Sequence, residues 1–446
     1  MLSAANNSAL EEKLLACIHC GLCLEACPTY VITGNENDGP RGRLYLMRAV
    51  AEGRLESTSN AFGTHINRCL GCRACEQVCP AGVEYGQLLE ASREVLHQKD
   101  SETNRLLGFV LRHVWLSPTR LKLFFGGSRL FRDLGLARLL LKSRLARLIS
   151  PRAEFAMALL ESSRPVFKYE PSSRQSDSHG ENVSLFLGCV GEGLFARVNR
   201  ATARVLRANN INVTAPSEQV CCGALHAHAG DLEGARELAR KNIAAFASGE
   251  PIITNAGGCG AMLATYGHLL ANDEKLARQA ADFSARVRDV SQQLATSGMQ
   301  TPPSSVEEAI TYDTSCHLLY GQHAGDASER MLRSIAGDKF VALNGTERCC
   351  GAAGIYNLLQ PEMSQRVLEE KLDHIRETHA ALLATGNPGC QMHIGAGARL
   401  AGMSLRVCHP VEVVDQAYER AGFYSRSTKK PRHPRLKTTS PPTTVS

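Results

Sequence analysis

The amino-acid sequence predicts an α+β protein, in which an α-helical, cysteine-rich N-terminal domain precedes two repeated α/β domains with parallel sheets. Two observations carry this prediction. The same four-cysteine pattern occurs twice in the first 80 residues, among segments of helix-forming composition. Farther along the chain, an order of strand, cysteine, helix and strand recurs after about 127 residues, the separation of Cys189 and Cys316.

Composition places the chain among globular proteins with several domains. Of its 446 residues, 43% are hydrophobic and 21% are charged. The net charge of +6 equals that of residues 425–446, which hold six Lys or Arg and no acid, so we expect no nucleic-acid partner. The sequence shows no secretory signal and no membrane-spanning run. With 17 cysteines, it is therefore expected to be a cytoplasmic protein with metal or redox chemistry.

Two cysteine runs match C-x2-C-x2-C-x3-C-P without a mismatch, a pattern typical of ferredoxins with two iron–sulfur clusters. Three cysteines spaced by two residues can point at one cube, while the fourth points toward the other cube and the proline ends the local helix. The runs therefore predict two [4Fe–4S] clusters with crossed ligands. Cluster 1 takes Cys17, Cys20, Cys23 and Cys79, and cluster 2 takes Cys69, Cys72, Cys75 and Cys27. A pair of zinc sites is the alternative.

Residues 1–100 are predicted to form a helical ferredoxin-type domain. Between the two runs, Arg43–Glu52 has helix-forming composition, and so has the segment after the second run. A compact β-rich ferredoxin would have a shorter spacer that contains strands. We therefore expect both clusters to lie between helices.

Residues 101–180 are predicted to be a basic helical linker. Its core, residues 105–152, holds eleven Lys or Arg and a single acid, with leucines in an amphipathic pattern. Pro118 and the pair Gly126 and Gly127 are expected to divide it into three short helices. Two interpretations stay open: helices packed on their own protein, or a surface that docks on a membrane or a partner.

The second half contains two related domains, placed at residues 181–300 and 301–424 after a polar boundary at 169–181. The expected strands are Val183–Leu187 and Pro251–Thr254 in the first copy, and Ala309–Tyr312 and Ala380–Ala384 in the second. Alternating strands and helices at this spacing indicate a parallel sheet with helices on its faces. Residues 425–446 are expected to be a disordered basic tail.

Each α/β copy carries four cysteines near strand ends, where open α/β sheets bind ligands. They are Cys189, Cys221, Cys222 and Cys259 in the first copy, and Cys316, Cys349, Cys350 and Cys390 in the second. Four thiols are enough to hold a further cluster, and buried cysteines that act as small hydrophobes are the alternative. Gly191 and Gly193 fit a dinucleotide fingerprint, but no acid closes the next strand, so nucleotide binding is not expected. Cys408 is the seventeenth cysteine and receives no role.

With these motifs in place, the chain resembles the iron–sulfur subunits of bacterial glycolate oxidases. These belong to a wider group that joins a two-cluster ferredoxin domain to two CCG domains, as heterodisulfide reductases and anaerobic glycerol-3-phosphate dehydrogenases do. The resemblance spans roughly residues 10–424. Three segments carry it most specifically: Cys17–Gly21, Asn37–Arg43 and Asn387–His393.

The resemblance implies a subunit that relays electrons and has no catalytic residue of its own. In such a complex, flavin-containing subunits remove hydride from glycolate, and often from D-lactate. The iron–sulfur subunit then passes single electrons toward a quinone or another acceptor at the membrane. From the basic segment 105–152, rather than from the resemblance, we expect peripheral attachment to the inner membrane. Flavin can divide a two-electron step, which suits one-electron clusters. The alternatives are a heterodisulfide-reductase-like or anaerobic glycerol-3-phosphate dehydrogenase-type subunit with redox chemistry at its CCG halves, and a zinc-stabilised scaffold.

The chain departs from the full CCG motif, which ends in C-x-x-C in heterodisulfide reductases. Met262 stands three residues after Cys259, and His393 stands three residues after Cys390. Disulfide chemistry is therefore not expected to carry over. Because His393 occupies a ligand position, we expect an additional cluster in the second CCG domain, with His393 in place of the missing cysteine.

Overall fold

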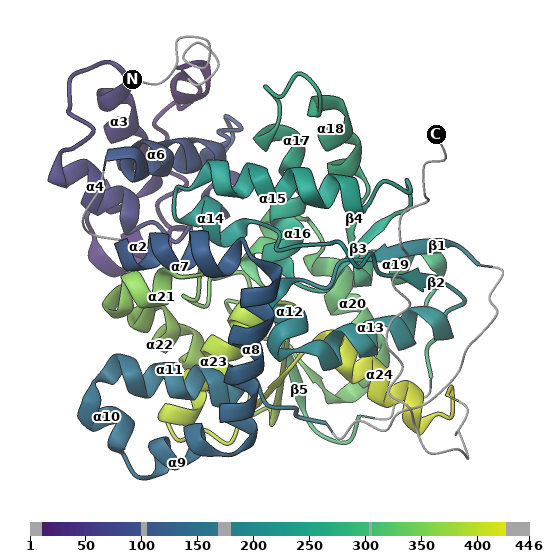
Figure 1. Ribbon diagram of the computed structural model, residues 1–446. Coiled ribbons are helices and arrows are strands. Elements are labelled where there is room, and N and C mark those ends of the chain that lie inside the picture. Colours follow the sequence, from purple (N-terminus) through teal and green to yellow (C-terminus); the bar gives the residue numbers. More distant parts are fainter. Residues whose placement is uncertain (1–10, 100–104, 168–179, 303–305, 425–446) are drawn as a thin grey trace.

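The computed structural model describes residues 11–99, 105–167, 180–302 and 306–424. The chain forms a helical N-terminal domain, a set of linker helices and two α/β domains (Figure 1), which confirms the predicted fold class. Most of the predicted boundary at 169–181 and the whole tail at 425–446 lie outside the described residues.

The described part of the ferredoxin-type domain is built from helices. They are α2 (Pro28–Thr33), α3 (Pro40–Ala51), α4 (Asn60–Asn67), α5 (Ala74–Gln77) and α6 (Tyr85–Lys99). Leu44, Phe62 and Leu88 from α3, α4 and α6 meet in its core. Pro80 follows the end of α5, as the pattern predicts. Pro28 instead occupies the first turn of α2, where a missing N–H costs no hydrogen bond, so the expectation that it ends a helix is wrong.

Each CCG domain has a four-stranded parallel sheet of the same topology. The first sheet has the order β2-β1-β3-β4, with β1 (Asn182–Leu185), β2 (Asn212–Thr214), β3 (Ile252–Thr254) and β4 (Val287–Asp289). The second has the order β6-β5-β7-β8, with β5 (Ile310–Asp313), β6 (Phe340–Val341), β7 (Leu382–Thr385) and β8 (Arg406–Cys408). The four predicted strands are the central pair of each sheet. The edge strands β4, β6 and β8 escaped prediction because β4 and β8 each contain an arginine and β6 has only two residues, so none of them forms an apolar run.

Helices join successive parallel strands, as a parallel sheet requires. In the first CCG domain they are α12 (Cys189–Leu194), α13 (Ala196–Ala208), α14 (Ala224–His228), α15 (Leu232–Ala245), α16 (Gly257–Ala264), α17 (Tyr266–Leu269), α18 (Ala277–Ala285) and α19 (Val290–Ser297). In the second they are α20 (Gly325–Ala336), α21 (Tyr356–Leu359), α22 (Pro361–Glu377), α23 (Pro388–Leu400) and α24 (Pro410–Arg420).

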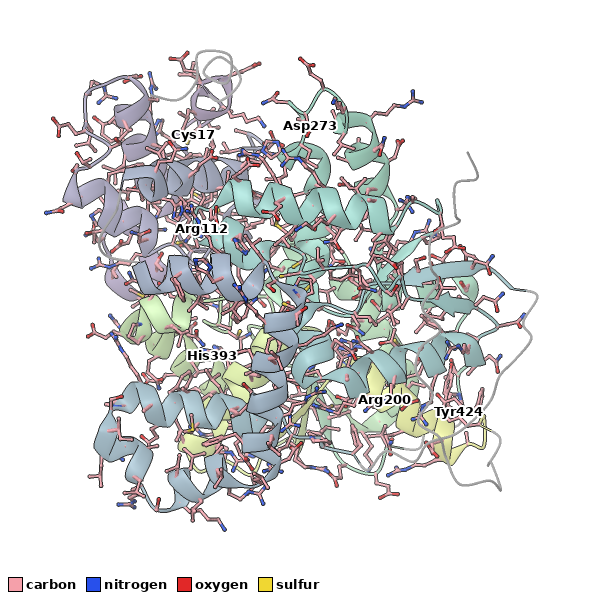
Figure 2. The ribbon with its side chains drawn as sticks, viewed as in Figure 1. Cys17, Arg112, Arg200, Asp273, His393 and Tyr424 are labelled. Carbon is pink, nitrogen blue, oxygen red and sulfur yellow. The ribbon has the colours of Figure 1, made fainter. Side chains whose placement is uncertain are left out.

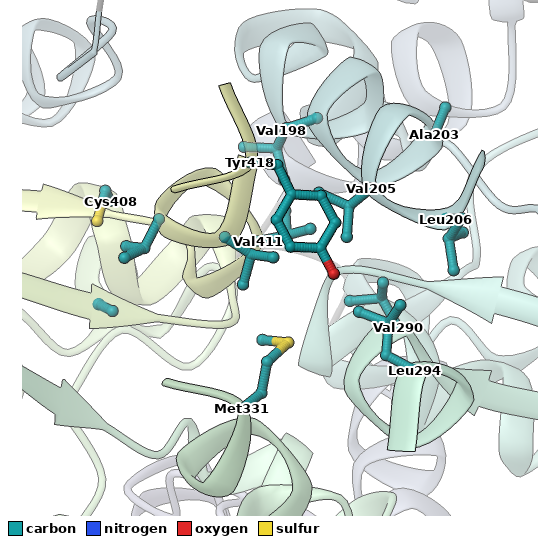
Figure 3. Close-up of a cluster of buried hydrophobic side chains, with 14 of the residues drawn as sticks. Val198, Ala203, Val205, Leu206, Val290, Leu294, Met331, Cys408, Val411 and Tyr418 are labelled. Atoms are coloured by element: carbon teal, nitrogen blue, oxygen red, sulfur yellow. The ribbon is translucent and has the colours of Figure 1, made fainter. Parts of the chain in front are cut away.

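The two CCG domains share one hydrophobic core, in which α13 packs on α24 (Figure 3). Val205 of the first domain and Val411 of the second belong to the same cluster of buried side chains. Arg197 Nε lies 2.8 Å from Glu412 Oε1 in a buried ion pair between the two helices. Cys408 is 0% exposed in this core, so the seventeenth cysteine packs as a small hydrophobe.

The linker contains more helix than expected. Its elements are α7 (Arg105–Val110), a π-helical turn (Leu111–Trp115), α8 (Pro118–Asp133), α9 (Leu136–Lys142), α10 (Leu145–Ile149) and α11 (Pro151–Ser162). The division at Pro118 is confirmed, but Gly126 and Gly127 lie inside α8, so the division expected there is wrong. The helix instead ends just before Gly135, which separates α8 from α9 and has a φ of +77° that glycine adopts without strain. Leu121 and Phe125 are buried, which holds α8 on the protein despite its interior glycines.

Candidate metal centres

Two neighbouring pockets in the ferredoxin-type domain contain all eight predicted cluster cysteines. The cluster-1 pocket has a volume of about 430 Å³, which includes space open to solvent, and the cluster-2 pocket about 300 Å³. The cluster-1 pocket is lined by Cys17, Cys20, Cys23, Cys75 and Cys79, and the cluster-2 pocket by Cys27, Cys69, Cys72 and Cys75. Each pocket thus contains the fourth cysteine of the opposite run, which fits the crossed pattern. Cys75 borders both.

The backbone shapes both cysteine runs in the same way. His19 and Gly71 precede the second cysteine of their runs with φ values of +55° and +67°. Gly21 and Arg73 follow that cysteine with φ values of +86° and +65°. Positive φ is uncommon for His and Arg, so these turns are held by their surroundings and mark a functional loop.

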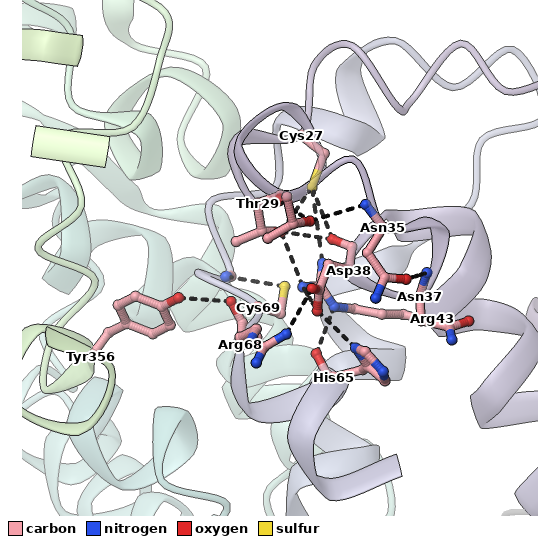
Figure 4. Close-up of polar contacts among 12 residues, drawn as sticks. Cys27, Thr29, Asn35, Asn37, Asp38, Arg43, His65, Arg68, Cys69 and Tyr356 are labelled. Atoms are coloured by element: carbon pink, nitrogen blue, oxygen red, sulfur yellow. Dashed lines mark hydrogen bonds and ion pairs between the residues drawn. The ribbon is translucent and has the colours of Figure 1, made fainter. Parts of the chain in front are cut away.

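A buried cation, Arg43, lies beside the cluster-2 pocket (Figure 4). It donates hydrogen bonds to Thr29 Oγ1 at 3.0 Å and to the His65 carbonyl at 2.7 Å, and its Nη1 lies 3.9 Å from Cys27 Sγ. Burial opposes its charge, but nearby Cys69 and other groups raise the pKa of Arg43, so it stays charged. A fixed positive charge at this place favours thiolates and a reduced cluster.

Asp38 completes this network. It is fully buried, and its carboxylate lies 2.8 Å from His65 Nδ1 and 2.9 Å from Arg68 Nη1. Burial opposes ionisation, yet the hydrogen bonds from His65 and Arg68 hold the pKa of Asp38 below its usual value. Site prediction from the cysteines alone missed Arg43 and Asp38. The only signal for them was the segment Asn37–Arg43, which the resemblance singles out.

In the first CCG domain, the four predicted cysteines converge near the carboxyl ends of β1 and β3, and we call this set the CCG-1 site. Cys189 begins α12, Cys259 lies in α16, and Cys221 and Cys222 precede α14. The Sγ atoms of Cys189 and Cys221 are 3.5 Å apart, and Cys222 contacts Cys259. The hydrogen bond with Cys221 and burial raise the pKa of Cys189. Crowded thiols that resist ionisation suit a metal, because a cation stabilises several thiolates at once.

The second CCG domain repeats this arrangement, and we call its four cysteines the CCG-2 site. The Sγ atoms of Cys316 and Cys349 are 3.9 Å apart, and Cys350 contacts Cys390. Asn387 Nδ2 donates a hydrogen bond to Cys390 Sγ at 3.3 Å. A buried ion pair, Lys371 Nζ to Asp313 Oδ1 at 2.7 Å, lies at the same end of the sheet.

Figure 2 marks His393, which lies on α23 one turn after Cys390 of the CCG-2 site. Its Nε2 lies 3.3 Å from Ser364 Oγ, and its Nδ1 lies 3.4 Å from Asn357 Nδ2. Burial lowers the pKa of His393 to about 3, so the ring is neutral. Both ring nitrogens have protein partners, which favours support of the cysteine loop over ligation. The role of His393 as a ligand stays a prediction.

Other histidines beside cysteines have structural partners. His226 is buried, and its Nδ1 lies 2.9 Å from Asp231 Oδ2. His228 and His317 stack with ring centroids 5.5 Å apart, between the two CCG domains. His317 Nε2 also lies 3.3 Å from the carbonyl oxygen of Gly71.

The cluster-2 pocket lies against the CCG-2 site. Leu70 packs in one buried cluster with Cys316 and Cys349, and Cys72 lies at its edge. Tyr356 of the second CCG domain donates a hydrogen bond to the carbonyl of Arg68 at 2.8 Å (Figure 4). The two sites therefore form one continuous packed region.

The arrangement of possible metal-binding side chains bears on the alternative that the cysteines bind single zinc ions. Across residues 11–99, 105–167, 180–302 and 306–424, no three His, Cys, Asp or Glu side chains are grouped to hold one metal ion. The ferredoxin-type cysteines instead line two adjacent pockets, with five thiols at one and four at the other. Soft thiolates as the sole donors are the usual ligands of such clusters.

Two protein-family models match the chain. One, described as a 4Fe-4S dicluster domain, matches residues 13–83. The other, described as a cysteine-rich domain and named CCG, matches residues 183–264 and 310–395. The chain is therefore an iron–sulfur protein whose N-terminal domain is of the two-cluster [4Fe–4S] type.

Relatives among characterised proteins agree with this. A probable glycolate oxidase iron–sulfur subunit of Bacillus subtilis (strain 168) is 37% identical over 423 residues, covering 92% of this chain and 95% of the relative. The glycolate oxidase iron–sulfur subunit of Escherichia coli (strain K12) is 32% identical, with 93% and 97% covered. Lactate utilization protein A of Oceanobacillus iheyensis is 32% identical over 52% of this chain and 96% of its own length. These findings support an iron–sulfur electron-transfer role within an oxidoreductase complex, and the chain belongs to the family of glycolate oxidase iron–sulfur subunits.

Proposed function

We propose that this chain carries single electrons from a flavin-containing partner, which oxidises glycolate and also D-lactate, to a quinone or another acceptor at the membrane. The observation that carries this proposal is the row of adjacent cysteine sites. The cluster-1 pocket opens to solvent, the cluster-2 pocket is its neighbour, and the CCG-2 site follows. Closely spaced one-electron sites serve transfer and need no catalytic residue.

The surface around the cluster-1 pocket supports docking of a redox partner. Cys20 is exposed, and the neighbouring side chains of Ile18 and Leu22 are 66% and 60% exposed. Exposed apolar side chains around a redox site are typical of an interaction surface. We therefore place the flavin subunit at this end of the row.

Division of labour is tested with the isolated chain. Glycolate should reduce the clusters only when the flavin subunits are present, which is followed as bleaching of the cluster absorbance. Glycolate-dependent bleaching of the isolated chain would show that the chain itself oxidises the substrate.

Crossed ligation of the two [4Fe–4S] clusters is the second part of the proposal. Cys79→Ser should damage cluster 1, and Cys27→Ser should damage cluster 2, because serine is a poor ligand for iron. Electron paramagnetic resonance of each variant identifies the affected cluster. If Cys27→Ser altered only the cluster of Cys17, Cys20 and Cys23, the crossing would be wrong.

We also propose that the CCG sites bind at least one further iron–sulfur cluster. Each site brings four thiols together near strand ends, with the closest pair of sulfur atoms 3.5 Å apart in the first domain and 3.9 Å apart in the second. The full-length chain should then contain more than about eight irons, the content of two [4Fe–4S] clusters. Combined Cys189→Ser and Cys316→Ser substitutions should reduce the iron content to that of the ferredoxin-type domain. An unchanged iron content in this variant would contradict the proposal.

Finally, we propose that the chain is cytoplasmic and makes a peripheral contact with the inner membrane through α8, α9 and α10. Leu148 and Ile149 are 80% and 75% exposed, next to the exposed bases Arg144 and Arg147. No helix in the described ranges is long and apolar enough to cross a membrane. Anionic lipid attracts each nearby base by about 1 kcal/mol, and salt screens the attraction.

Sedimentation with anionic vesicles tests this contact. Binding at low salt and release at high salt are expected, with weaker binding for Leu148→Ser combined with Ile149→Ser. Leu358→Ser, at an exposed site on the second CCG domain, is the matched control and should bind as the wild type does. Absence of binding at low salt would assign the basic surface to the partner subunits instead.

A further inference from the structure

Tyr85, the first residue of α6, lies between the two pockets of the ferredoxin-type domain. Its side chain is buried and lines both the cluster-1 and the cluster-2 pocket. Its hydroxyl donates a hydrogen bond to Cys69 Sγ at 3.6 Å. A buried tyrosine hydroxyl normally has a hydrogen-bond partner, and here that partner is a sulfur atom of the cluster-2 pocket.

The sulfur of Cys69 accepts a second hydrogen bond. The backbone N–H of Gly71 lies 3.4 Å from the same Sγ, and Cys69 itself is buried. On the other side of the pocket, Arg43 Nη1 lies 3.9 Å from Cys27 Sγ (Figure 4). N–H and O–H groups therefore point at two of the four sulfurs predicted to bind cluster 2.

The cation at the cluster-1 pocket is arranged differently. Arg41 lines that pocket, but it donates its hydrogen bonds to the Glu36 carboxylate at 2.7 Å and to the His19 carbonyl at 3.1 Å. Cys20 of the same pocket is exposed, so water reaches this site. Water stabilises charge that is added to an exposed site, whereas in a buried site fixed protein dipoles must do so.

We propose that Tyr85 is a positioning residue whose hydroxyl acts through Cys69 to raise the reduction potential of cluster 2. Hydrogen bonds to the sulfurs are one of the features that set the potential of a cluster, because they stabilise the added negative charge. One electron leaves cluster 1 and enters cluster 2, while the Tyr85 hydroxyl keeps its proton. Tyr85 thus offsets the cost of reducing the buried cluster. The inference rests on the proposed function in one respect, the binding of cluster 2 by Cys69.

Redox titration of the full-length chain, followed by electron paramagnetic resonance, tests the inference. The signal of cluster 2 is the one altered in Cys72→Ser, because Cys72 lines the cluster-2 pocket. Tyr85→Phe keeps the ring and removes the O–H. It should shift the oxidised-to-reduced ratio of cluster 2 about tenfold toward oxidised, which is about 59 mV for one electron. The potential of cluster 1 should stay as in the wild type.

Tyr356→Phe is the matched control. It also removes a buried hydroxyl beside the cluster-2 pocket, but this hydroxyl donates to the carbonyl of Arg68 and not to a sulfur. Both cluster potentials should therefore equal those of the wild type. An equal shift of cluster 2 in Tyr85→Phe and Tyr356→Phe would assign the effect to packing and overturn the inference.

Electron–nuclear double resonance gives an independent readout, because it detects exchangeable protons close to a reduced cluster. One such proton of cluster 2 should be present in the wild type and in Tyr356→Phe, and absent in Tyr85→Phe. An unchanged cluster-2 potential in Tyr85→Phe would overturn the inference alone. If no signal were altered in Cys72→Ser, both the inference and the proposed binding of cluster 2 by the second cysteine run would be overturned.

Discussion

The two CCG domains have the same sheet topology, but each cysteine site has a different neighbour. The CCG-1 site lies under the linker, beside Trp115. The CCG-2 site lies against the ferredoxin-type domain, where Leu70 packs on Cys316 and Cys349. The second CCG site is therefore adjacent to the cluster-2 pocket, whereas the first CCG domain meets the ferredoxin-type domain through α14, which packs on α6, and through the ion pair of Arg236 with Glu94.

The helices that follow the edge strands β4 and β8 are capped by different residues in the two domains. Asp289 is the last residue of β4 and caps α19, and His409 follows β8 and caps α24, each with a capping box. Both side chains are buried. The two domains thus cap the helix after this strand with the same hydrogen-bonding motif. The capping side chain is an acid in the first domain and a base in the second.

The largest expected effect concerns the order of electron transfer. Cys316→Ser should remove the cluster at CCG-2, because serine does not replace a soft iron ligand. Since the cluster-2 pocket borders CCG-2, reduction of the cluster at CCG-1 should then slow by about tenfold or more. Cys189→Ser should leave reduction of the CCG-2 cluster as fast as in the wild type. Freeze-quenched electron paramagnetic resonance measures both rates. Equal slowing in the two variants would remove the proposed difference between the domains.

A large stability effect is expected at the buried pair of the second domain. Lys371→Met leaves the Asp313 carboxylate buried without its cation, which costs about 3–5 kcal/mol in the free energy of unfolding. Lys241→Met breaks an exposed pair with Glu237 on α15 and is the control, with an expected cost of about 0.3–0.5 kcal/mol. Denaturant unfolding compares them. Similar midpoints for the two variants would show that the buried pair does not stabilise the second domain.

The two caps predict opposite pH dependences of stability. Burial raises the pKa of Asp289 to about 6, so the folded state binds more protons than the unfolded state above pH 3.8, and stability falls as pH rises toward 6. Burial lowers the pKa of His409 to about 3, so the unfolded state binds more protons below pH 6.5, and stability rises with pH between about 3 and 6.5. Each contribution amounts to a few kcal/mol.

Urea unfolding between pH 4 and 7 tests these slopes. Asp289→Asn should remove the falling contribution, so that the variant gains stability with pH more steeply than the wild type. His409→Asn should remove the rising contribution and give a flatter or falling curve. Parallel curves for the wild type and both variants would contradict the assignment of these groups.

The smallest expected effect compares two helical glycines. Gly193→Ala places a Cβ against the Phe125 ring and should destabilise the first CCG domain by about 1–3 kcal/mol. Gly126→Ala, inside α8 with open space around its Cβ position, should stabilise the chain by up to about 1 kcal/mol. Thermal unfolding gives both signs. A stabilising Gly193→Ala would show that the linker does not clamp α12.

The sequence alone was sufficient for features that depend on short-range spacing. Within each run, the C-x2-C spacing constrains where neighbouring thiols can point, and the first three cysteines of each run do line one pocket together. The central strands β1, β3, β5 and β7 were predictable because each lies in a mostly apolar run, as is typical of strands buried on both faces, although Ser184 and Asp313 are buried in them as well. The repeat at about 127 residues then implied the shared topology.

Only the tertiary structure decided features that depend on contacts between distant segments. Gly126 and Gly127 read as a helix break, yet packing of Phe125 and Leu121 keeps α8 continuous through them. Nothing in the sequence near Tyr85 indicates that its hydroxyl reaches Cys69, and nothing near Leu70 indicates that it reaches Cys316. Local spacing determines which thiols of one run point at the same site. Which other segments pack against that site depends on the burial of apolar surface across the whole chain, and no single segment specifies it.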